Sequence, residues 1–141
     1  RPRGGTLLSV DLYRDFPDYS SGRDKVRAAR WMKVIDDPTA LLAVADSRTL
    51  ARFVGDGTID LVFLDGDHRH SVVAAEIKLW WPKLKPGGWM CGDDFERPTF
   101  DEALIEHDCA GGAHNGVIKA VTELLPHYSQ VGFFWKAQRR A

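Results

Sequence analysis

The chain contains the run Ile59-Asp60-Leu61-Val62-Phe63-Leu64, followed directly by Asp65-Gly66-Asp67-His68. Apart from Asp60 the run is apolar on both faces, which is typical of a central strand in a parallel sheet. We therefore expect a strand over 59–64 that presents two carboxylates and a histidine at its carboxyl end.

Short apolar runs alternate with helical patterns on either side of this strand. The expected strands are 6–10, 41–44, 89–92 and 128–135, and the expected helices are 21–34, 47–53, 71–81 and 116–125, with a further short helix near 101–107. Asp46 and Ser47 cap the second helix, and residues 85–88 form a tight turn. This alternation predicts a single α/β domain over residues 1–141, with a three-layer, Rossmann-like, mostly parallel sheet and helices on both faces.

Carboxylates follow three of the expected strands: Asp11 after the first, Asp65 and Asp67 after the central one, and Asp93 with Asp94 after the next. Ligands bind at the carboxyl ends of strands in open parallel sheets. If the strands that end at Asp65 and Asp93 are neighbours, several of these carboxylates should crowd into one site. Oxygen ligands of this kind suit Mg²⁺, Ca²⁺ or Mn²⁺. His68 lies close enough to take a proton from a bound hydroxyl. The other histidines, 70, 107, 114 and 127, are interpreted as surface or pocket-rim residues, and the stretch 111–114 as a flexible loop.

Composition excludes several classes of function. The 141 residues carry 19 basic and 20 acidic side chains, and the basic residues are dispersed, which argues against a nucleic-acid partner. No apolar run reaches the roughly 20 residues that a membrane helix needs. Cys91 and Cys109 form no CxxC pair, so a reduced, cytoplasmic setting is expected.

Taken together, the Asp65-Gly66-Asp67-His68, Lys85-Pro86-Gly87-Gly88 and Gly92-Asp93-Asp94-Phe95 motifs, with Gly116-Val117 later, resemble the second half of a class I S-adenosylmethionine-dependent methyltransferase. The likeness is to metal-dependent O-methyltransferases of the catechol and macrocin types. It implies transfer of a methyl group from S-adenosylmethionine to a metal-bound hydroxyl of a small molecule, with Mg²⁺ as the expected ion.

The resemblance also implies roles for individual residues. Asp65, Asp93 and Asp94 match the family's metal ligands, and His68 matches its general base. The implied cofactor-binding residues are Asp11 at the ribose hydroxyls, Asp46 and Ser47 beside the adenine, and Asp65.

The family's first strand and glycine-rich loop should precede Asp11 by some 20 residues on the general fingerprint spacing. Only ten residues stand before Asp11 here. We therefore expect a domain truncated at its N-terminus that binds S-adenosylmethionine weakly by itself. It should also form homo-oligomers, either through an exposed sheet edge or through a face carrying Trp80 and Trp81.

Two other interpretations remain open on the sequence. A Mg²⁺-dependent phosphohydrolase of the haloacid dehalogenase type would use Asp65 and Asp67, and a metal-dependent glycosyltransferase is a weaker version of that idea. The third class is a non-catalytic Rossmann-like module.

Overall fold

The computed structural model describes residues 5–11, 39–125 and 127–140, which fall into two compact units, 1–50 and 51–141. The expected helix over 21–34 lies outside the described residues.

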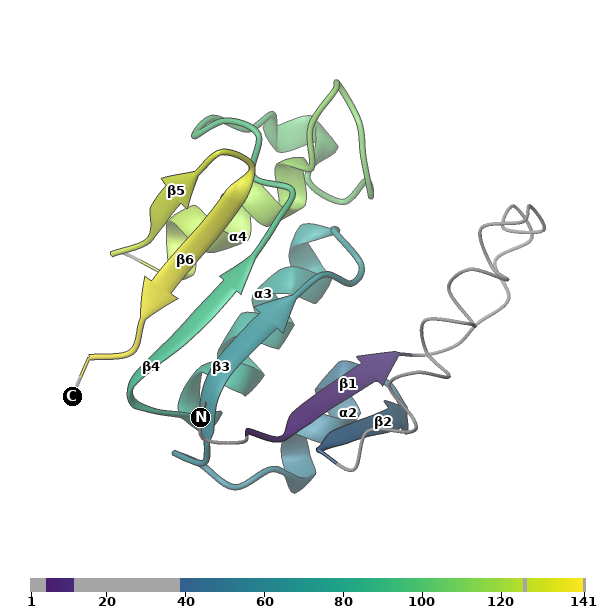
Figure 1. Cartoon of the computed structure of the whole chain (residues 1–141). Coiled ribbons are helices and arrows are strands. Elements are labelled where there is room, and N and C mark those ends of the chain that lie inside the picture. The colour runs from purple at the N-terminus through teal and green to yellow at the C-terminus, as the bar shows by residue number, and fades with distance from the viewer. Residues whose placement is uncertain (1–4, 12–38, 126, 141) are drawn as a thin grey trace. The chain divides into compact units, whose positions relative to one another are not determined.

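The first unit contains a parallel pair of strands (Figure 1). Strand β1 spans Leu7–Asp11 and β2 spans Ala40–Val44, with Leu7 opposite Ala40 and Asp11 opposite Val44. Helix α2, Ser47–Leu50, follows β2, and the Asp46 carboxylate accepts the Thr49 N–H at 3.0 Å. Both expected strands and the Asp46 cap are therefore confirmed.

The second unit is built on a four-stranded mixed sheet of order β3-β4-β6-β5 (Figure 1). Strands β3 (Ile59–Leu64) and β4 (Leu84–Gly92) are parallel, whereas β6 (Phe134–Gln138) runs antiparallel to both β4 and β5 (Ser129–Val131). The single strand predicted over 128–135 is wrong, because Gly132 adopts a φ of 62° and turns this segment into a hairpin.

The tight turn predicted at residues 85–88 is also wrong, because this segment lies inside β4. The additional residues of β4 are accommodated by a shift in the β3–β4 register between Ile59 and Leu61. Gly87 supplies a φ of 82°, and a Cβ on Gly88 would lie 3.1 Å from the Asp60 carbonyl oxygen. The glycines therefore permit an irregular strand start rather than a separate turn.

Helix α3, His70–Trp80, and helix α4, Asn115–Leu124, pack together against the sheet. The described residues of this unit also form three 3-10 turns: η1 at Ala51–Phe53, η2 at Trp81–Lys83 and η3 at Glu102–Leu104.

The buried core includes Ile77, Leu84, Met90, Phe95, Ile118, Val121 and Trp135. Trp80 also belongs to this core. No helix in the described ranges has the length and apolar character needed to cross a bilayer.

Strand β3 is not buried on both faces as predicted. Val62 is buried, but Leu61 and Phe63 are 60% and 49% exposed. Among the described residues β3 has one sheet partner, β4, and stands at the end of its sheet. The continuous apolar run therefore predicts more burial than the strand has in this unit.

Candidate functional site

The expected carboxylates do meet at the carboxyl ends of β3 and β4. Leu64 pairs with Gly92, so Asp65 and Asp93 follow paired positions. A Cβ on Gly92 would lie 2.5 Å from the Leu64 carbonyl oxygen and 2.8 Å from the Trp135 ring, so only glycine fits there. Asp65, Asp93 and Asp94 each place a carboxylate oxygen within 4.8 Å of the others.

This carboxylate triad is electrostatically strained. Burial raises the pKa of Asp93 above its usual range, and the neighbouring charges of Asp65 and Asp94 raise it further. A divalent cation would relieve this crowding, and three carboxylate oxygens are a donor set that Mg²⁺, Ca²⁺ or Mn²⁺ accepts. The residues present therefore fit the metal that the sequence predicts.

His68 is held by a carboxylate that lies far away in the sequence. Its Nδ1 lies 2.8 Å from Asp108 Oδ1, and the same oxygen accepts the His68 backbone N–H at 3.3 Å. With the proton on Nδ1, donated to Asp108, Nε2 keeps a free lone pair.

The free nitrogen of His68 faces the carboxylate triad. Nε2 lies 2.9 Å from Asp94 Oδ2, yet this buried nitrogen forms no hydrogen bond within the described structure. The two atoms are close without the geometry of a donor and an acceptor. Asp94 itself has a φ of 59°, a left-handed conformation that is uncommon outside glycine and that turns the backbone here.

A second histidine completes the cluster. His114 is the N-cap residue of α4, and its ring lies edge-on to His68 with the centroids 4.5 Å apart. Its Nδ1 lies 3.3 Å from Asp94 Oδ1 and 2.5 Å from Glu96 Oε1. Burial acts to raise the pKa of Glu96, but hydrogen bonds from His114 and the backbone outweigh it and lower the pKa.

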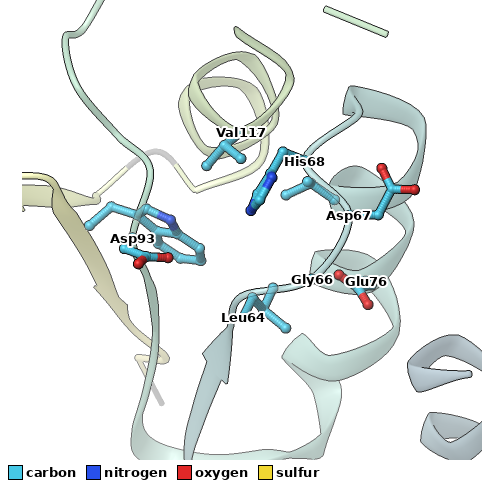
Figure 2. A pocket seen from close by; sticks show the side chains of 9 residues that line it. Leu64, Gly66, Asp67, His68, Glu76, Asp93 and Val117 are labelled. Atoms are coloured by element: carbon cyan, nitrogen blue, oxygen red, sulfur yellow. The ribbon is translucent and has the colours of Figure 1, made fainter. Parts of the chain in front are cut away.

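A small pocket opens beside these groups, lined by residues of β3, α3, α4 and β6 (Figure 2). His68 and Asp93 line it, and Trp135 adds a buried indole N–H that has no acceptor among the described residues. Asp67 also borders the pocket, but its carboxylate is bound by Arg69, whose Nε lies 2.9 Å from Oδ1. This contact lowers the pKa of Asp67 and makes it a poor proton donor.

The structure thus brings together four predicted site residues, Asp65, His68, Asp93 and Asp94. The predicted cofactor residues Asp11, Asp46 and Ser47 belong to the first unit. Asp11 ends β1, and its side chain lies outside the described part. The Arg48 guanidinium holds the pKa of Asp46 at about 2.

Sequence reasoning missed Glu96, Asp108 and Trp135, and it placed His114 only at a surface or pocket rim. The sequence feature that could have located His114 is the pair Gly111 and Gly112. Their φ values are 63° and 72°, and they form a tight turn closed by Ala110 and Ala113. This turn leads directly into α4 and fixes His114 at the start of the helix.

Comparisons with known proteins agree with this fold. A family model described as a methyltransferase domain matches residues 1–95. No curated protein sequence matches the chain.

Several solved structures share the fold. The O-methyltransferase NovP is 14% identical, with a TM-score of 0.60 over 99% of this chain and 62% of its own. The MycE methyltransferase of mycinamycin biosynthesis, solved with Mg and SAH, is 14% identical, with a TM-score of 0.57 over 99% of this chain and 46% of its own. A putative O-methyltransferase from Klebsiella pneumoniae is 19% identical, with a TM-score of 0.58 over 99% of this chain and 64% of its own.

The chain therefore spans less than two thirds of the length of these structures. The family match covers more than half of the chain, and the sheet and its carboxylate edge agree with it. This chain belongs to the family of methyltransferase domains that this model describes.

Proposed function

We propose that this chain takes part in transfer of a methyl group from S-adenosylmethionine to a hydroxyl of a small molecule, with a divalent cation at the carboxylate triad. The observation that carries the proposal is the meeting of Asp65, Asp93 and Asp94 within 4.8 Å, with His68 Nε2 2.9 Å from Asp94. The MycE neighbour, solved with Mg and SAH, supports the same pairing of ion and cofactor.

Asp65, Asp93 and Asp94 would hold the cation at the end of the sheet. The raised pKa of Asp93 supports this role, since a crowded carboxylate gains most from a nearby positive charge. When bound, the cation supplies positive charge that lowers the pKa of an acceptor hydroxyl.

His68 would accept the proton of that hydroxyl. Asp108 takes the Nδ1 side of the ring, so Nε2 is the nitrogen that can act as a base toward the triad. His68 lines the small pocket, so a hydroxyl bound there lies within its reach. When bound, S-adenosylmethionine would supply the methyl group on its sulfonium sulfur, which would keep the electron pair of the broken bond, and His68 would hold the proton taken from the acceptor hydroxyl. This step depends mainly on positioning.

The cofactor would be bound by Asp11 at its ribose hydroxyls and by Asp46 and Ser47 near its adenine. The carboxyl ends of β1 and β2, where these residues lie, are the side of a parallel sheet that binds ligands. Asp65 is the remaining candidate for a cofactor contact.

The phosphohydrolase interpretation is not supported. It requires Asp67 to act as an acid, whereas Arg69 binds that carboxylate and lowers its pKa. The match to a methyltransferase family also argues against a phosphohydrolase.

The test is transfer of a labelled methyl group to phenolic and sugar acceptors in the presence of Mg²⁺. Asp93→Asn and His68→Gln should each lower the rate by about 100-fold or more, because each removes a group that the transfer step uses. Asp60→Asn is the matched control, since Asp60 is an exposed carboxylate paired with Lys85 at the far end of β3. Equal rates in Asp93→Asn and the unmodified protein would remove the basis of the proposal.

A further inference from the structure

His68, His114 and Asp94 form a second cluster of possible ligands that only partly coincides with the carboxylate triad. Each contributes a ligand atom, and these atoms lie within 4.8 Å of one another. The three side chains come from separate elements: the loop after β3, the loop after β4 and the start of α4. The side chains of His68 and His114 are each 18% exposed, and that of Asp94 is 26% exposed. The cluster is therefore largely shielded from water but still accessible.

The contact between His68 Nε2 and Asp94 needs a proton or a metal ion between the two atoms. Nε2 lies 2.9 Å from Asp94 Oδ2, while Asp108 Oδ1 lies 2.8 Å from Nδ1 on the other side of the ring. Nε2 is buried and makes no hydrogen bond within the described structure. With the proton on Nδ1, the lone pair of Nε2 faces a carboxylate oxygen, and a metal ion between them removes the repulsion.

The spacings are compatible with ligands around one metal ion, with the two histidines facing different oxygens of Asp94. Donors about 2.1 Å from a tetrahedral Zn²⁺ lie about 3.4 Å apart, and the separation falls to about 3.0 Å when the angle between them closes toward 90°. The measured separations are 2.9 Å for His68 Nε2 to Asp94 Oδ2 and 3.3 Å for His114 Nδ1 to Asp94 Oδ1.

Asp108 lies behind the His68 imidazole, 2.8 Å from Nδ1, while Nε2 faces Asp94. A carboxylate in this position orients a histidine ligand and strengthens it as a donor in metalloproteins. On His114, Glu96 Oε1 lies 2.5 Å from Nδ1, the same nitrogen that lies 3.3 Å from Asp94, so a metal ion bound at Nδ1 would replace the proton on that nitrogen.

We infer that His68, His114 and Asp94 form a binding site for a transition-metal ion such as Zn²⁺, distinct in chemistry from the carboxylate triad. Two imidazoles and one carboxylate favour Zn²⁺ over Mg²⁺, which prefers oxygen donors. Asp94 belongs to both sites, and His68 would lose its free lone pair to the metal. On the proposed function, Zn²⁺ at this site would therefore inhibit methyl transfer.

The test measures metal binding without S-adenosylmethionine or acceptor. Zn²⁺ is titrated into the purified protein in excess Mg²⁺ against a chromophoric chelator, and Co²⁺ is added separately to record its visible absorption bands. We expect one Zn²⁺ site, with an affinity lowered at least about tenfold by His114→Gln. Asp65→Asn should leave Zn²⁺ binding within about twofold, because Asp65 belongs only to the triad.

His127→Gln is the matched control, since His127 is exposed. His68→Gln supplies a second ligand variant in case His114→Gln lowers the melting temperature. Unchanged Zn²⁺ affinity in both histidine variants would overturn the inference, as would loss of Zn²⁺ binding in Asp65→Asn alone. Zn²⁺ binding that depends on the histidines in a protein without methyl transfer would refute the proposed function and leave the metal site standing.

Discussion

His68 and Asp108 are 40 positions apart in the sequence, yet His68 Nδ1 lies 2.8 Å from Asp108 Oδ1. Asp108 also accepts the backbone N–H of His68, so one carboxylate fixes both the ring and the loop that carries it. The pair resembles the base and orienting acid of other active sites, where the acid sets which ring nitrogen is free.

Asp108→Asn should reduce the turnover number for methyl transfer about tenfold while leaving the KM for S-adenosylmethionine within about twofold. The amide can donate its own proton to Nδ1, which favours the tautomer with the wrong free nitrogen. Steady-state kinetics of the two parameters separate this positioning effect from loss of binding. Asp56→Asn, at an exposed carboxylate paired with Lys83, is the control. A changed KM with an unchanged turnover number would contradict the positioning role.

A divalent cation should stabilise the second unit. Because the folded state raises the pKa of Asp93, ionisation of this carboxyl costs stability. Without metal, this destabilising contribution is absent below the ordinary pKa, grows as the pH rises from the ordinary pKa to the folded pKa, and is complete above the folded pKa. Saturation at 100 times the dissociation constant adds about 2.7 kcal/mol, which thermal unfolding detects.

Asp93→Asn should raise the melting temperature in a chelator at neutral pH and abolish most of the rise caused by Mg²⁺. The substitution removes one of three crowded charges and one ligand at the same time. Asp60→Asn again provides the comparison, since Lys85 already neutralises that carboxylate at 2.8 Å. If Mg²⁺ raised the melting temperature of Asp93→Asn as much as that of the unmodified protein, the triad would not be its binding site.

The sequence predicted the carboxylates and the histidine at the strand ends better than it predicted the loops and the hairpin around them. Asp65, His68, Asp93 and Asp94 are adjacent to strands whose type is clear from local pattern, and parallel pairing then brings them together. Asp108 and Glu96 lie in irregular segments, where no periodicity shows which way a side chain points. The hairpin at 129–138 was missed because its strands are short and its turn depends on one glycine, Gly132.

The acid dependence of the first unit should reflect Asp46. Arg48 and the Thr49 N–H hold its pKa at about 2, below the ordinary 3.8, so its contribution to stability is complete above about pH 4 and is lost as the pH falls toward 2. Because the side chain is 29% exposed, we expect less than about 1 kcal/mol from this ion pair. Denaturant unfolding of Asp46→Asn across this range should show a shallower loss than the unmodified protein, and an identical slope would contradict the assignment.

Gly116 should tolerate no side chain, because α4 starts against the loop that carries His68. A Cβ at this position would overlap the His68 carbonyl oxygen and the His70 backbone nitrogen, and it would lie 2.5 Å from the Ile105 carbonyl oxygen. These are backbone atoms that cannot swing away, so Gly116→Ala should cost about 1–3 kcal/mol and displace His68 from Asp94. Thermal unfolding measures the first effect, and loss of the Co²⁺ absorption bands measures the second. Gly66→Ala is the matched comparison, because its Cβ would meet only the Glu76 carboxylate at an ordinary 3.8 Å. Equal stability of the two variants would show that α4 and the His68 loop are less closely packed than described.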